Sequence, residues 1–404
     1  SKAIPSHTMC VVSLPREMKF LKNNVCAPKG FKAISKSIGI KKSNKPDFAV
    51  IFSNVLANAA AVYTSNNVKG APLIVTKKHL EDGKAQAIVI NSGIANVCTG
   101  KKGIKDAEDM TKCTANELEI DANNVLVAST GLIGAYLPMN RIKNGIKGIK
   151  NELSVSADAA AAIMTTDTIK KEIAVKVDNF TIGAIAKGAG MIHPNMATML
   201  CFITTDAEIP SKNLSIFLKN SVNKSFNMIS VDMDTSTSDM AVIIANGLAG
   251  KADYKKFQKT LDYVCLELAK KIAKDGEGAT KLVEIEVRNA ATKSDAQKLA
   301  KSVISSNLVK CALFGNDPNW GRIVCAMGNS GAKFEQSFVD VYFGKELIVS
   351  NGVTTHFNLE KVKDVMNKDT LKITINLNQG RENAVAYGCD MSYGYIKINA
   401  LYTT

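Results

Sequence analysis

The sequence predicts an α/β protein in which helices cover the faces of β-sheets. Short apolar or alternating runs, typical of strands, recur along the 404 residues, and segments with helical periodicity lie between them. No low-complexity tract or clear repeat interrupts this alternation. Hydrophobic residues make up 46% of the chain, so a sizeable core can be buried.

The first half of the chain contains two buried strands and a short helix. Residues 84–91 (KAQAIVIN) end in an apolar run followed by a turn at 91–93, and residues 125–130 (VLVAST) form a short strand that Gly131 ends. The alanine-rich segment 157–164 is expected to be helical, because alanine has the highest helix propensity.

The middle of the chain contains a hairpin and a further buried strand. Residues 172–177 and 180–186 alternate apolar and polar side chains on either side of Asp178-Asn179, which predicts a β-hairpin. Residues 198–203 form the next apolar run and are expected to be a buried strand.

The second half begins with a long helix and continues with strands. Residues 254–274 carry an apolar stripe at helical spacing, and Asp275-Gly276 is expected to end that helix. Residues 282–287 and 371–377 alternate as half-buried strands do. No long linker separates these elements, so the sequence marks domain boundaries only weakly.

The net charge of +14 admits two interpretations. Nucleic-acid binding is one, but the chain has neither a sustained basic block nor a basic stretch with interleaved aromatic residues. The basic residues are almost all lysines, with arginine only at positions 16, 141, 288, 322 and 381. A solvated lysine-rich surface is the better explanation, and it can attract a small anionic substrate. We therefore expect no nucleic-acid partner.

The cysteines and histidines indicate neither disulfides nor a metal site. The nine cysteines form no C-x-x-C pair, and several lie in apolar runs (Cys201, Cys265 and Cys325), so mostly buried, reduced thiols of an intracellular protein are expected. No two of the four histidines have a metal-ligand spacing, so no metal is expected. The longest apolar runs, such as 240–245, are too short to span a membrane.

The start of the chain gives no targeting signal. Residues 1–12 lack a secretory apolar segment and an arginine-rich amphipathic pattern. Either the protein stays where it is made, or a targeting peptide has already been removed.

The most unusual segment is 187–200 (KGAGMIHPNMATML). Its two glycines permit backbone conformations that other residues resist, and its HPN tripeptide indicates a turn. Ala197-Thr198 then stands at the start of the buried strand. A strained loop of this kind can present the threonine hydroxyl to the preceding carbonyl, whereas a plain glycine-rich turn would have the same composition.

This segment resembles the self-cleavage site of the ornithine acetyltransferase (glutamate N-acetyltransferase) family. Other segments resemble that family in the same order, over roughly residues 27–404. They are NSGIANVCTG at 91–100, STGLIG at 129–134, IMTTDT at 163–168, SFNMISVDMDTSTSD at 225–239, DGEGATK at 275–281, GNDPNWGRI at 315–323 and the closing YIKINALYTT. Met233 and Ala60 stand where the family pattern has Gly, and Ser238 where it has Asn. None of the three supplies a reacting group, so we expect these departures to affect local packing.

The resemblance implies that Thr198 is the nucleophile of a self-cleaving enzyme. Its Oγ is expected to attack the Ala197 carbonyl, shift the peptide bond to an ester and leave that ester to hydrolysis. The products are an α chain of residues 1–197, with the oxyanion hole and part of the substrate site, and a β chain of residues 198–404, with the nucleophile and the rest of the site. The freed α-amine titrates near pH 8 and can serve as the base for its own hydroxyl.

The remaining site residues also come from the resemblance. The Thr130 hydroxyl and the Gly131 N–H are implied to form the oxyanion hole. Substrate contacts are implied at Thr165, Thr166, Lys187, Thr198, Glu277, Asn399 and Thr404. Lys187 suits a substrate carboxylate, and Glu277, between two glycines, suits a substrate amino group. The choice between the adjacent threonines stays open, and so does that between a local cap or turn role and a ligand contact for Asp167.

The implied reaction is a ping-pong transfer of the acetyl group from N2-acetylornithine to glutamate through acetyl-Thr198, as in cyclic arginine biosynthesis. His193 is not required as a base, and no cofactor is implied, although acetyl-CoA stays open as a second acetyl donor. The implied fold is a sandwich of sheets between helix layers, of the N-terminal-nucleophile type. Its intertwined α and β chains form an α2β2 heterotetramer in the cytoplasm, plastid stroma or mitochondrial matrix.

Three alternatives stand beside this hypothesis. An N-terminal-nucleophile aminopeptidase or amidohydrolase would use the same threonine but release the acyl group to water. A relative serving clavam-type secondary metabolism would share the transfer chemistry. A non-enzymatic binding protein, driven by the positive charge, would keep an uncut chain and bind nucleic acid in a salt-dependent way.

Overall fold

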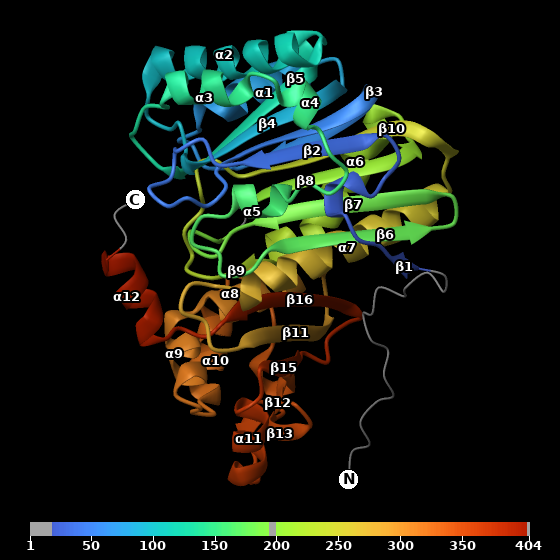
Figure 1. The fold of residues 1–404 in the computed structure, drawn as a ribbon. Coiled ribbons are helices and arrows are strands. Elements are labelled where there is room, and N and C mark those ends of the chain that lie inside the picture. The colour runs from blue at the N-terminus through green and yellow to red at the C-terminus, as the bar shows by residue number, and fades with distance from the viewer. Residues whose placement is uncertain (1–17, 194–198, 402–404) are drawn as a thin grey trace.

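The computed structural model describes residues 18–193 and 199–401 (Figure 1). Among these residues, two β-sheets and their covering helices make up the protein. No helix in the described ranges is long and apolar enough to cross a membrane.

The larger sheet has nine strands within the described ranges, in the order β1-β6-β7-β8-β10-β3-β4-β5, with β2 paired to β3. Their bounds are β1 Lys19–Phe20, β2 Phe31–Lys36, β3 Phe48–Tyr63, β4 Lys84–Ile94, β5 Val125–Leu132, β6 Lys171–Val177, β7 Phe180–Lys187, β8 Leu200–Glu208 and β10 Met240–Lys251. Strands β8 and β10 lie in the middle of this sheet and run parallel to each other. Each strand begins with a continuous apolar run, LCFI in β8 and MAVIIA in β10, which fits this position because strands buried on both faces have no polar alternation.

The nine-stranded sheet is folded into layers. Helices α1 (Ala71–His79), α2 (Gly100–Leu118), α3 (Met139–Ile146) and α4 (Ile149–Glu152) lie outside the β4–β5 half, and α6 (Ser211–Lys224) and α7 (Tyr254–Lys274) lie outside the β7–β8–β10 half (Figure 1). The other faces of both halves share one core, in which Ile90 and Leu126 join Phe202 and Val242. The predicted sandwich of sheets between helix layers is therefore confirmed.

The smaller sheet has seven strands in the described part of the chain, in the order β14-β13-β12-β15-β11-β16-β9. Their bounds are β9 Ile229–Ser230, β11 Leu282–Ala290, β12 Asp340–Phe343, β13 Glu346–Ser350, β14 Val353–Thr354, β15 Thr370–Asn376 and β16 Glu382–Cys389. Helices α8 (Lys293–Ser305), α9 (Asn307–Phe314), α10 (Trp320–Gly328) and α11 (Leu359–Met366) complete its core, with residues such as Leu299 and Val362. Short 3₁₀ helices lie at Asn24–Cys26, Ala122–Asn124, Phe226–Met228 and Gln336–Phe338.

Most elements follow the sequence patterns. The hairpin is confirmed as β6 and β7, and Asp178 at its turn takes a left-handed φ of 49°. Helix α7 occupies the predicted range, and the Asp253 side chain caps it by accepting from the Lys256 N–H. The alanine-rich helix is shorter than predicted: α5 covers only Ala159–Ile163, because Asp158 acts as its N-cap.

The cysteines are less buried than expected. Cys201 and Cys265 are buried, but Cys325 is exposed. Cys325 lies on the face of α10 opposite Ile323 and Met327, which pack into the core. Apolar neighbours in the sequence are therefore not enough to predict that this thiol is buried.

The order of the strands interleaves the two halves of the chain. Strands β8 and β10 follow position 198, and they lie between β7 and β3, which precede it. A cut between positions 197 and 198 would leave both products hydrogen-bonded within one sheet.

Candidate active site

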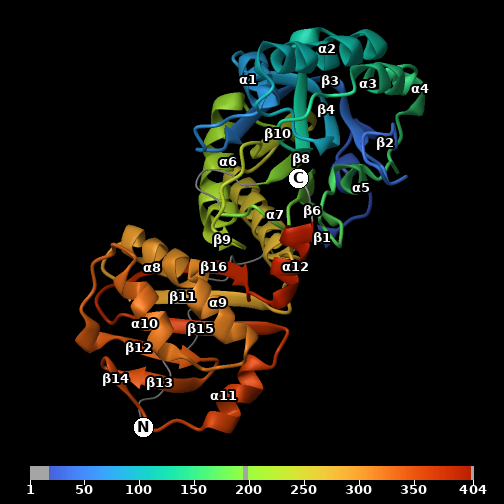
Figure 2. The same ribbon diagram turned by 90° about the vertical axis from the view of Figure 1, so that its left-hand side faces the viewer.

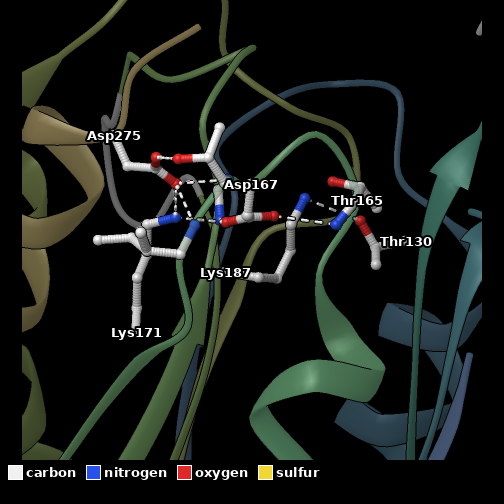
Figure 3. Close-up of polar contacts among 9 residues, drawn as sticks. Thr130, Thr165, Asp167, Lys171, Lys187 and Asp275 are labelled. Atoms are coloured by element: carbon white, nitrogen blue, oxygen red, sulfur yellow. Dashed lines mark hydrogen bonds and ion pairs between the residues drawn. The ribbon is translucent and has the colours of Figure 1, made fainter. Parts of the chain in front are cut away.

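The site is built where the ends of β5 and β7 meet. In the hydrogen-bonding order these strands are five steps apart, which would be roughly 24 Å in a flat sheet at about 4.8 Å per step. Yet Lys187, the last residue of β7, donates from Nζ to Thr130 Oγ1 on β5 at 3.3 Å (Figure 3). The folding of the sheet onto a shared core therefore creates this contact.

Gly131 lies beside Thr130 in a conformation that only glycine accepts readily. Its φ is +127°, and β5 pairs in parallel with β4 so that Gly131 faces Gly93. A Cβ atom at Gly131 would lie 2.3 Å from the carbonyl carbon of Gly93. The backbone here can approach its neighbour closely because neither residue has a side chain.

A small pocket opens beside these residues. It is lined by Thr130, Lys187, Gly188, Gly190, Met191, Ile192, Met199, Leu200, Ser236, Ser238 and Asp239. Ala197 and Thr198, the expected cleavage site and nucleophile, lie outside the described residues, but Ile192 and Met199 on either side line the pocket. Ser238 also lines the pocket, two residues before β10 begins, so any packing effect of this departure would fall on the pocket wall.

Buried charges dominate the pocket. Burial lowers the pKa of Lys187, while Asp167, Asp239 and Glu277 act in the opposite direction by attracting its charge. Burial raises the pKa of Asp239 well above its usual value, although Ser236 and Lys187 oppose this shift. An anionic group that binds in the pocket would therefore stabilise the charged form of Lys187.

The Asp167 carboxylate holds together several segments of the site. Its Oδ1 accepts from Lys171 Nζ at 2.6 Å and from the Gly188 N–H at 2.7 Å, and its Oδ2 accepts from the Thr165 N–H at 2.9 Å (Figure 3). Burial opposes the charge of this carboxylate, but Lys187 and Lys171 outweigh burial and lower its pKa to about 2. The bond to Thr165 is the local turn contact that the sequence suggested, and the bond to Gly188 in addition joins the threonine loop to the end of β7.

The two candidate threonines lie in the loop between α5 and β6. Thr165 and Thr166 are both partly buried, and the N–H of Thr165 is fixed by Asp167. The choice between their side chains as substrate contacts stays a prediction.

Glu277 and Asn399 form a hydrogen-bonded pair that packs against the glycine segment beside the pocket. The Glu277 side chain is held by Asn399 Nδ2, which donates to Oε2 at 2.7 Å, and the Glu277 N–H donates to the Ala189 carbonyl at 2.8 Å. A Cβ atom at Gly190 would lie 2.3 Å from Glu277 Oε2, so the carboxylate packs directly on the glycine backbone. Gly190 lines the pocket, which places Glu277 at its edge.

Asn399 is carried by the C-terminal helix α12 (Tyr393–Leu401), which lies beside the junction of the two sheets (Figure 2). The hydroxyl of Tyr395 on the same helix donates to Asp232 Oδ2 at 3.1 Å. Through Asn399 this helix contacts Glu277, whereas Thr404 lies outside the described residues.

The His193 side chain contacts serines that do not line the pocket. Its Nδ1 lies 3.0 Å from Ser230 Oγ, and burial, with a contribution from Lys301, lowers its pKa to about 4. The imidazole is therefore neutral near pH 7 and contacts Ser230, which is not among the pocket residues.

The sequence did not identify Lys171 or Asp275. Lys171 is completely buried, and its ammonium contacts both Asp167 and Asp275 at 2.6 Å. Asp275 appeared in the sequence as a helix end and as the first residue of the DGEGATK segment, with no role of its own, and Lys171 only as one of many lysines. No local pattern distinguishes a buried lysine from a solvated one.

Comparisons with known proteins agree on one family. The profile of the ArgJ family matches residues 32–404. The chain is 48% identical to the arginine biosynthesis bifunctional protein ArgJ of Caldanaerobacter subterraneus subsp. tengcongensis, over 96% of this chain and 100% of that protein. It is 46% identical to the protein of the same name from Listeria monocytogenes, again over 96% and 100%. A solved ornithine acetyltransferase from Mycobacterium tuberculosis, complexed with ornithine, is 41% identical over 45% of this chain and 100% of that chain, with a TM-score of 0.43.

Proposed function

The chain belongs to the ArgJ family, and from this membership we propose that it is a bifunctional acetyltransferase of arginine biosynthesis. It moves the acetyl group of N2-acetylornithine to glutamate, giving ornithine and N-acetylglutamate, and it also acetylates glutamate from acetyl-CoA. The observation that supports the site assignment is the partly buried contact between Lys187 and Thr130 in a pocket that Met199 lines. This contact joins a cation that can bind a carboxylate to a hydroxyl group, and Met199 directly follows the proposed nucleophile in the sequence.

The first half-reaction forms an acetyl-enzyme. The α-amine of Thr198 takes the proton of its own hydroxyl while Oγ attacks the acetamide carbonyl of acetylornithine. The negative charge that develops on the carbonyl oxygen is stabilised by the Thr130 hydroxyl and the Gly131 N–H. The C–N bond then breaks, the ornithine nitrogen takes the proton, and an acetyl ester of Thr198 remains.

The second half-reaction reverses these events with another amine. Ornithine leaves, glutamate enters the same pocket, and its amine attacks the ester carbonyl. The C–O bond breaks, the Thr198 oxygen recovers a proton, and N-acetylglutamate leaves. With acetyl-CoA as donor, the thioester C–S bond breaks in the first half-reaction and the thiol of CoA leaves.

The buried charges suit two substrates that are both α-amino acids. Lys187 provides a positive charge for a carboxylate, and Glu277 provides a negative charge for an ammonium group of the substrate. Because the pKa of Lys187 is lowered by burial, binding of a carboxylate stabilises its charged form. One arrangement can therefore serve the donor and the acceptor in turn, which fits a ping-pong scheme.

Self-cleavage before Thr198 would give an α chain of residues 1–197 and a β chain of residues 198–404. The interleaved order of β7, β8, β10 and β3 supports a stable complex of both chains after the cut. We further propose that two such pairs assemble as an α2β2 heterotetramer, which sedimentation of the purified protein would test.

Intact-mass measurement and an acetyl-transfer assay test this function together. The denatured wild-type protein should give two fragments divided before Thr198, and Thr198→Ala should give one uncut, inactive chain. Acetylornithine should be consumed rapidly only when glutamate is present. Equal consumption without glutamate would identify a hydrolase instead, and full transfer by Thr198→Ala would refute the proposed nucleophile.

A further inference from the structure

We propose that Lys171, with Asp167 and Asp275, forms a buried triad that positions the two substrate-binding loops around Lys187. This "Lys171 triad" deepens the function proposed above, on which it rests, by adding positioning residues to the site. It comprises one lysine and two carboxylates from two parts of the chain, residues 167–171 and Asp275 (Figure 3).

The three charged groups of the triad are in direct contact and are buried. Lys171 Nζ lies 2.6 Å from Asp167 Oδ1 and 2.6 Å from Asp275 Oδ2. The side chains of Lys171 and Asp167 are fully buried, and that of Asp275 is 6% exposed. Buried charges are stable only when they are paired and hydrogen-bonded, so the three groups depend on one another.

Each carboxylate also holds a loop of the site. Asp167 accepts from the N–H groups of Thr165 and Gly188, which ties the threonine loop to the residue that follows Lys187. Asp275 accepts from the Thr168 N–H at 3.0 Å and from its hydroxyl, at the other end of the same loop.

Asp275 also stands two residues before Glu277, whose N–H is bonded to the Ala189 carbonyl. Lys171 therefore connects the threonine loop with the loop that carries Glu277. Since Lys171 precedes position 198 and Asp275 follows it, the connection would run between the two chains after cleavage.

The charge of Lys171 also keeps Lys187 available. Asp167 attracts both ammonium groups, and Figure 3 shows it between Lys171 on one side and Lys187 with Thr130 on the other. While Lys171 occupies Asp167 Oδ1, the Lys187 ammonium stays directed to Thr130 and the pocket. Without Lys171, the uncompensated Asp167 would draw Lys187 away from the position where a substrate carboxylate binds.

The test compares Lys171→Met and Asp275→Asn with a matched control, Lys170→Met. Lys170 is the neighbouring lysine, and its ion pair with Asp158 at 2.8 Å is exposed. For each variant, kcat and KM for acetylornithine and glutamate are measured together with thermal unfolding and intact mass. Lys171→Met should raise both KM values about 10- to 100-fold, with a smaller change in kcat, because the loops that bind substrate shift by a fraction of an ångström to 1 Å. Lys170→Met should stay within about twofold of the wild type, as expected for an exposed pair.

Amide hydrogen exchange supplies a readout that needs no substrate. Exchange at Thr165 and Gly188 should be faster in Lys171→Met than in the wild type and unchanged in Lys170→Met. If the wild type transferred no acetyl group, the proposed function would fail, while this exchange result would still decide the positioning role. If Lys171→Met did not fold, Asp275→Asn would decide: its amide oxygen preserves the shape of the site and favours folding, but it removes one of the two charges that hold Lys171, so KM and exchange at Thr165 and Gly188 should rise in the same direction. Wild-type KM values and wild-type exchange in a folded variant of the triad would overturn the proposal.

Discussion

Replacing Gly131 with alanine should disable the enzyme through one methyl group. Gly131 has a φ of +127°, which an L side chain rarely adopts, and holding a non-glycine residue in such a region costs about 1–3 kcal/mol. The added Cβ would also lie 2.3 Å from the carbonyl carbon and 2.5 Å from the carbonyl oxygen of Gly93. Both contacts are with backbone, so no side-chain rotation can relieve them.

The short distances at Gly131 set the expected loss of catalytic rate in Gly131→Ala. Carbon atoms in contact prefer about 3.5–4.0 Å, so β5 must move from β4 by roughly 1 Å at the Thr130–Gly131 step. A misplacement of about 1 Å at reacting groups can cost about 100-fold in rate, and loss of an oxyanion donor costs about 100- to 1,000-fold. Gly131→Ala should therefore lower kcat for acetyl transfer by at least about 100-fold and lower the free energy of unfolding.

Gly134→Ala is the control for this prediction. Gly134 also has a positive φ, +83°, but a Cβ added there meets nothing within 4 Å. The Gly134→Ala variant should lose about 1–2 kcal/mol of stability because of backbone strain, and the folded variant should keep its activity. The reasoning would be refuted if Gly131→Ala kept more than half of the wild-type kcat, or if both variants were destabilised equally and stayed active.

Three further predictions concern single side chains. Met233 has a left-handed φ of 66° and is 51% exposed, so Met233→Gly should raise the free energy of unfolding in urea by up to about 1 kcal/mol; a decrease would contradict this. Burial lowers the pKa of Lys301 to about 7, so the unfolded chain binds more protons between pH 7 and 10, and stability should rise there by up to about 1.4 kcal/mol per pH unit. Lys301→Met should remove this part of the slope in unfolding measured at pH 7, 8 and 9. Glu277→Gln keeps an acceptor for Asn399 but loses the charge, so KM for acetylornithine should rise about 10- to 100-fold with unchanged thermal unfolding; an unchanged KM would remove Glu277 from the substrate site.

Local patterns predicted the elements well where short-range chemistry decides them. The hairpin of β6 and β7 and the full length of α7 follow from periodicity and turn residues. The helix at 157–164 was predicted too long, because propensity favoured alanine on both sides of Asp158, whereas the cap fixed the start. Cys325 was predicted buried from its apolar neighbours, but the orientation of α10 decided its exposure.

For the site, the sequence supplied some residues through a family resemblance, and the structure showed how they lie together. Resemblance to a family supplied Thr130, Lys187, Glu277 and Asn399, and the structure brings these four around the glycines at 188–190. Composition or spacing could not have chosen Lys187 among so many lysines. Ser238 was expected to affect local packing, and the structure shows that it lines the pocket.

The sequence alone determined the layered α/β class, α7, the hairpin of β6 and β7, the approximate places of several other strands, and the glycines that the close approaches require. These properties depend on side-chain period, propensity and steric freedom within a few residues. Only the tertiary structure decided that β5 meets β7, that Asp167 pairs with Lys171, and that Lys171 reaches Asp275, which is 104 residues away. Burial and charge pairing depend on which distant segments exclude water together, and the folding of the sheet sets that arrangement.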